Sequence, residues 1–195
     1  MSSPSALPGT PKRVLLLVYD TFAEFEVSVL ITALTGTTHT LTTFGLTGGA
    51  VTSTGGLRVV PDMAIAEVDP GEFDALVVPG GEASRLLGRP ELQRLVTALD
   101  RRGALLAAIC GGPAVLGDAG VLDGRSFTAA LAPKDRAWPG VAGRGNRLSE
   151  MVVVDGNVVT ATGSSYLSFA EEVLRCLDER SDVEPLTFFR EPSLG

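Results

Sequence analysis

Residues 104–113 read ALLAAICGGP, a short apolar run that ends at Cys110 and is followed at once by Gly111 and Gly112. A run that is apolar on both faces is typical of a central strand in a parallel sheet that helices cover on each side. Glycines permit the sharp turn that such a strand needs before a helix. We therefore predict a strand, a tight turn that carries the cysteine, and a helix.

Two further apolar runs, at residues 14–19 and 74–79, predict strands of the same kind. Between the runs, residues 23–34 and 90–101 place apolar side chains at helical spacing. This alternation predicts an α/β fold, a flavodoxin-like doubly wound sandwich with a mainly parallel central sheet.

The rest of the chain completes this fold without a repeat or an interdomain linker. Asp155-Gly156 is a type I′ turn signal, so the apolar residues around it predict a β-hairpin. The expected elements are strands at 40–46 and, at a sheet edge, 56–60, the hairpin at 151–161, and a closing amphipathic helix at 165–177.

Length and composition indicate one globular domain. The 195 residues divide into a flexible N-terminal tail at 1–12, the α/β domain at 13–180 and a C-terminal tail at 181–195. A hydrophobic content of 45% excludes disorder as the main state, and a net charge of −7 argues against nucleic acid or an anionic membrane as a partner. Without a signal-like start or a run long enough to span a bilayer, a cytoplasmic location is expected.

The small number of cysteines and histidines limits the kinds of site that the chain can form. Cys110 and Cys176 are isolated from each other and His39 is the only histidine, so neither a disulfide framework nor a zinc site is expected, and no cofactor is indicated. His39 opens a predicted strand, which puts it at the opposite end of the sheet from Cys110. Cys176 lies at helical spacing with Val173 and Leu177 and is predicted to pack in the core.

Ligands of doubly wound sheets bind beyond the carboxyl ends of the strands, where the loops at 20–26, 79–82 and 110–113 should converge. A cysteine at a strand–turn–helix junction resembles a nucleophile elbow, and the positive end of the following helix would favour its thiolate. The plain alternative is that Cys110 is a small buried hydrophobe.

Backbone and carboxyl groups in the other two loops are candidate partners of the thiol. The N–H groups of Gly80-Gly81 would stabilise a developing oxyanion, although a simple strand-to-helix turn explains them equally well. Glu24 and Glu26 point in different directions from one helix, so at most one of them reaches the site. A buried carboxyl there would have a raised pKa and exchange a proton with the thiol, whereas an exposed one would only interact with the helix dipole.

These motifs together resemble the ThiJ/PfpI superfamily, which includes the Parkinson-associated deglycase, PfpI-type proteases and isonitrile hydratases, and which is related to class I glutamine amidotransferases. The resemblance extends over about residues 13–177, and its most specific piece is AAICGGP at 107–113. It implies that Cys110 is the nucleophile, that Glu26 is the acid hydrogen-bonded to it, and that the chain forms a homodimer. The oxyanion loop of the family falls on Gly80 and Gly81.

The chain departs from the family pattern in its histidines. The deglycase and glyoxalase branch carries a histidine in the segment matching 126–130, and the protease branch carries one directly after the nucleophile, where this chain has Gly111. The hydratase-like branch uses cysteine and carboxylate without that histidine, but usually with a hydroxyl residue at the position of Gly111. These departures from the family pattern therefore favour a mechanism without a catalytic histidine.

The sequence predicts a cysteine-dependent hydrolase, hydratase or lyase that acts on a small electrophilic carbon. Cys110 attacks, Glu26 transfers the proton, and the N–H groups of Gly81 and Gly111 hold the developing anion. The alternatives are a redox-sensing or stress-response protein with an oxidisable Cys110, and a scaffold without chemistry. Candidate residues of the pocket rim are Tyr19, Asp20, Lys134, Asp135, Trp138 and Tyr166.

Overall fold

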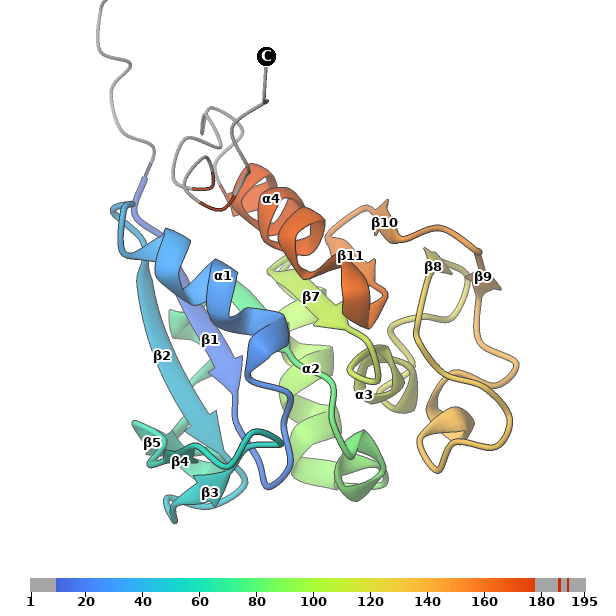
Figure 1. The fold of residues 1–195 in the computed structure, drawn as a ribbon, viewed down its shortest axis with the longest axis horizontal. Helices are drawn as coiled ribbons and strands as arrows, with labels where there is room; N and C mark the ends of the chain where they lie inside the picture. Colours follow the sequence, from blue (N-terminus) through green and yellow to red (C-terminus); the bar gives the residue numbers. More distant parts are fainter. Residues whose placement is uncertain (1–9, 178–185, 187–188, 190–195) are drawn as a thin grey trace, which may run out of the picture.

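A seven-stranded sheet in the order β10-β11-β7-β6-β1-β2-β5 forms the centre of the computed structural model, which describes residues 10–177, 186 and 189 (Figure 1). Neighbouring strands are parallel except for β10 and β11, which form the predicted antiparallel hairpin. The strands are β1 (Arg13–Leu17), β2 (Thr40–Gly45), β5 (Met63–Ala64), β6 (Ala75–Val78), β7 (Leu105–Ile109), β10 (Val152–Asp155) and β11 (Val158–Ala161). The predicted fold class is confirmed.

Helices cover both faces of this sheet. α1 (Phe25–Leu34) and α4 (Tyr166–Leu177) pack against each other, as Figure 1 shows, while α2 (Pro90–Arg101) and α3 (Pro113–Asp118) contact β7. The crossovers β1–α1–β2 and β6–α2–β7 run in opposite directions along the sheet, and right-handed crossovers then put α1 and α2 on opposite faces. The strand order reverses between β6 and β1, which is where such sheets bind ligands.

The apolar runs that predicted the central strands are buried except for Asp74 and Cys110, which are half-buried. In β6 and in β7 every residue is buried, because helices cover both faces of these strands. The helix predicted at 90–101 has those bounds. The helix predicted at 23–34 begins only at Phe25, since the preceding turn has Thr21 at a φ of +72° and pairs Phe22 with Gly81.

The strand predicted at 56–60 at a sheet edge forms in shorter form, as β4 (Arg58–Val59). It pairs with β3 (Val51–Thr52) in a separate two-stranded sheet. The Asp62 carboxylate accepts the N–H of Thr43 in β2 at 2.7 Å, so the chain pairs with β2 only from Met63 onward, as β5. A second small sheet, β8 (Ser126–Phe127) with β9 (Asn146–Arg147), was not predicted.

The prediction that Cys176 packs in the core is wrong, and Phe25 of α1 is exposed as well. Phe25 is 53% exposed and meets Tyr166 edge-on, and Cys176 lies on the outer side of α4. The tails predicted at 1–12 and 181–195 fall almost entirely outside the described residues. Within the described part of the chain, no helix has the length and apolar character needed to cross a membrane.

Candidate active site

The loops after β1, β6 and β7 meet at the carboxyl ends of these strands, as predicted. The Gly80 N–H donates a hydrogen bond of 2.6 Å to Oε2 of Glu26. A Cβ atom built on Gly163, which follows β11, would lie 3.0 Å from Sγ of Cys110 and 3.2 Å from Oε1 of Glu26. The thiol and the carboxyl group are therefore neighbours against the same backbone.

The backbone of Cys110 has the strained geometry of a nucleophile elbow. Its φ of +61° lies in the left-handed region, which is unfavourable for a residue with a side chain. Its N–H donates to the carbonyl of Ala161 at 2.8 Å, and its carbonyl accepts the N–H of Ala130 at 2.9 Å. These two hydrogen bonds hold the strained conformation, which turns the thiol away from the strand.

Glycine is required where the backbone closes around the pair. A Cβ on Gly80 would lie 2.6 Å from Cβ of Cys110 and 2.8 Å from Oε2 of Glu26, and one on Gly112 would lie 2.3 Å from the carbonyl oxygen of Val78. No side chain fits at these distances. The predicted Gly80-Gly81 turn thus has a steric reason in addition to any role of its N–H groups.

Glu26 is the buried carboxylate of the loop after β1. It lies in the first turn of α1 and is 1% exposed. The Glu24 carboxylate, in contrast, accepts a hydrogen bond from the Thr54 hydroxyl at the surface. Burial raises the pKa of Glu26, and the hydrogen bonds from the Cys110 thiol and the Gly80 N–H oppose that rise.

The Cys110 thiol holds its proton more tightly than an ordinary cysteine. Burial, and then the negative charge and hydrogen bond of Glu26, raise its pKa to about 12, although the Gly111 N–H favours the thiolate. The N–H at the start of the turn into α3 thus favours the thiolate in the predicted direction, but burial next to a carboxylate outweighs it. The pair shares a proton that must move to Glu26 when the sulfur reacts.

The predicted rim residues Tyr19, Asp20 and Trp138 do not line the space beside Cys110. Tyr19 is 4% exposed, and its hydroxyl donates to the Gly80 carbonyl at 2.7 Å. This hydrogen bond holds the Gly80-Gly81 turn from the core side. The Asp20 carboxylate accepts the N–H of Thr52 in β3, and Trp138 packs beneath the Arg147 guanidinium at 5.2 Å.

A cavity of about 370 Å³ opens beside the thiol. Lys134 and Asp135, two of the predicted rim residues, do line it, on a loop at 130–137 that sequence reasoning did not otherwise assign to the site. The full lining consists of Gly81, Glu82, Cys110, Gly111, Ala130, Leu131, Lys134, Asp135, Arg136 and Ala137. The thiol is thus open to a small molecule.

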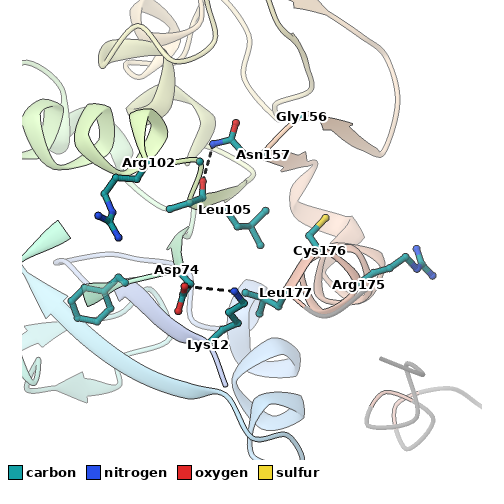
Figure 2. Close-up of a pocket in the computed structure, with 12 residues that line it drawn as sticks. Lys12, Asp74, Arg102, Leu105, Gly156, Asn157, Arg175, Cys176 and Leu177 are labelled. Carbon is teal, nitrogen blue, oxygen red and sulfur yellow. Dashed lines mark hydrogen bonds and ion pairs between the residues drawn. The ribbon is translucent and has the colours of Figure 1, made fainter. Parts of the chain in front are cut away.

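A larger cavity, of about 500 Å³, lies at the opposite end of the sheet (Figure 2). Lys12 and Asp74 face each other there at 3.7 Å, and Cys176 lines its edge. His39 lies at this end too, where its Nδ1 accepts the Lys12 N–H at 3.1 Å. Within the described residues, no group of three or more His, Cys, Asp or Glu side chains is placed to hold a metal ion.

Comparison with known proteins identifies relatives of this chain. A model of the DJ-1/PfpI family matches residues 12–176. The deglycase TK1284 of Thermococcus kodakarensis is 35% identical over 150 residues, which cover 76% of this chain and 89% of that protein. The uncharacterized protease YoaZ of Bacillus subtilis is 31% identical over 177 residues, covering 86% and 84%. The solved structure of the DJ-1 superfamily protein Atu0886 from Agrobacterium tumefaciens matches with a TM-score of 0.80 and 32% identity, over 91% of this chain and 97% of that one.

Proposed function

The chain belongs to the DJ-1/PfpI family, and from that premise we propose that it is a cysteine-dependent enzyme acting on a small molecule with an electrophilic carbon. The reaction is a hydrolysis, a hydration or a lyase-type addition. The observation that carries the proposal is the pairing of a strained, cavity-facing thiol, Cys110, with a buried carboxyl group, Glu26. Relatives named as deglycases and as a protease support an enzymatic role.

The first chemical step joins Sγ of Cys110 to the electrophilic carbon. As the S–C bond forms, the thiol proton moves to the Glu26 carboxylate and the π electron pair of the substrate moves to its oxygen or nitrogen. The N–H groups of Gly81 and Gly111 stabilise that developing charge, and Glu26 then returns its proton to the same atom. A carboxyl group whose pKa is raised is suited to both proton transfers near neutral pH.

This mechanism uses no histidine. His39 lies at the amino ends of the strands, away from Cys110, so the thiol and the carboxyl group act as a two-residue unit within one chain. We also propose a homodimer in a reducing, cytoplasmic compartment, which light scattering and fractionation would test.

The proposal is tested with a panel of methylglyoxal, isonitriles and small amides. We expect Cys110→Ser and Glu26→Gln each to reduce turnover at least about 100-fold, because each removes one half of the proton-transfer pair. Intact-mass measurement should show an adduct on Cys110 of the wild type with the reactive class of compound. Full turnover by Cys110→Ala would show that the mechanism is wrong.

A redox role is the second candidate, and the same open cavity favours it. Peroxide can reach the thiol and supply both oxygen atoms of a sulfinate, which a protonated Glu26 would stabilise by a hydrogen bond. Titration with peroxide followed by mass spectrometry tests this role. A Cys110 that stays unmodified while Cys176 oxidises would eliminate it.

A further inference from the structure

Two cations line the cavity without a hydrogen-bonding or ion-pair partner among the described residues, and we propose that they form a subsite for an anionic group of the substrate. Lys134 and Arg136 line the cavity beside Cys110 and have exposed side chains. Within the described residues, the structure gives neither side chain a hydrogen bond or an ion pair. The proposal deepens the function proposed above, since it names the substrate class of that site.

The anions of the same cavity are already engaged by their own loops. Oδ2 of Asp135 accepts the Ala132 N–H at 2.6 Å, and Oε1 of Glu82 accepts the Ser84 hydroxyl. Neither carboxylate pairs with Lys134 or Arg136. The two cations therefore remain available to a ligand, in a protein whose net charge is −7.

The loop that carries the cations is braced against the nucleophile. Nη2 of Arg147 donates to the carbonyls of Ala129 at 2.7 Å and Leu131 at 2.5 Å, on either side of Ala130. The N–H of Ala130 in turn holds the carbonyl of Cys110. The start of the loop is thus fixed relative to the sulfur, and the Asp135 carboxylate between the two cations holds the next turn through the Ala132 N–H.

This arrangement selects a small carbonyl compound that carries a carboxylate or phosphate on the side away from the reacting carbon. Lys134 and Arg136 are exposed at the wall of this cavity, so they would meet a distal charged group of the substrate and not the sulfur itself. Cations at the mouth of a cavity raise the local concentration of an anionic ligand, and salt screens the effect.

The first test uses two disulfide reagents of similar size, the anionic dithiobis(nitrobenzoate) and the neutral dithiodipyridine, in a Cys176→Ser background so that only Cys110 reacts. We expect Lys134→Gln with Arg136→Gln to lower the ratio of the anionic to the neutral rate constant by about fivefold at low salt, and high salt to remove the difference.

The control variant, Arg94→Gln with Arg101→Gln, removes two exposed cations of α2 and so changes the net charge equally. The double substitution Lys134→Gln with Arg136→Gln is called the cavity variant. An unchanged ratio of the anionic to the neutral rate constant in the cavity variant, or an equal fall in the control, would overturn the subsite. The exchange Lys134→Arg with Arg136→Lys keeps both charges and must keep the ratio, which separates charge from damage to the loop.

The second test compares butyraldehyde, succinic semialdehyde and glyceraldehyde phosphate as substrates. We expect the cavity variant to raise KM about fivefold for the anionic aldehydes alone, with kcat unchanged, and the larger of the two effects identifies carboxylate or phosphate as the preferred group. If no aldehyde turns over, the lyase-type addition to an aldehyde fails as the reaction, while the reagent ratios still decide the subsite. Equal KM changes for all three aldehydes would contradict the subsite.

Discussion

The contact between Gly163 and the reacting pair shows how little space the site leaves around its thiol. A Cβ at this position would touch both Sγ of Cys110 and Oε1 of Glu26. Gly163 lies after β11, and nothing in its immediate sequence indicates that it approaches Cys110. The site therefore depends on a residue that has no reactive group of its own.

Substitution of that glycine should displace the sulfur. We expect Gly163→Ala to lower the free energy of unfolding by about 1–3 kcal/mol, because a methyl group must be forced into a closed contact. Alkylation of Cys110 should slow at the same time. The matched control is Gly48→Ala, whose added methyl group would meet nothing within 4 Å. Equal unfolding curves for the two variants in urea would show that the contact is not restrictive.

At the scale of elements, the central strands and one helix could be predicted from the sequence. The two-residue strands and the loop beside Cys110 could not. β1, β6 and β7 are apolar on both faces, and α2 begins at a proline and has one apolar side, so periodicity identifies them. β5, β8 and β9 have two residues each, too few for any period. The loop at 130–137 was missed in large part because its place beside Cys110 comes from long-range contacts with Arg147 and with Cys110 itself.

The brace between β9 and that loop can be tested without changing its charge. Arg147→Lys keeps the cation but loses the paired donors to the carbonyls of Ala129 and Leu131. We expect kcat to fall about tenfold as the cavity wall moves. Trp138, the only tryptophan, lies under this guanidinium, so its fluorescence should change in parallel.

Arg144→Lys is the control for this brace, because Arg144 pairs with Asp123 at the surface. It should leave both kcat and the tryptophan emission as they are. An Arg147→Lys enzyme with altered emission but wild-type kcat and an unshifted pH profile would limit Arg147 to a structural role.

At the scale of the whole molecule, one buried carboxyl group changes how stability depends on pH. The pKa of Glu26 is raised, so the folded state binds its proton more tightly than the unfolded state does. As the pH rises above the ordinary glutamate value of about 4.5, the unfolded state ionises first and stability falls until the folded pKa is passed. Urea unfolding from pH 4 to 8 should show this loss in the wild type and a smaller one in Glu26→Gln.

Glu24, two positions away, supplies a control of opposite sign. Burial is the largest single influence and raises its pKa, but the hydrogen bonds from backbone N–H groups, Thr54 and Ser53 together outweigh burial and lower the pKa. Its contribution to stability is therefore present above the ordinary pKa and lost as the pH falls through the folded value. If Glu24→Gln and Glu26→Gln altered the pH profile in the same direction, the assignment of their environments would be wrong.

The hydrogen bond from the Cys110 N–H to Ala161 has a consequence for the newly made chain. The strained turn is held by a strand that is synthesised after the cysteine, so a polypeptide that lacks β11 cannot hold Cys110 in its left-handed conformation. The position of the sulfur beside Glu26 is therefore completed only when the C-terminal hairpin docks.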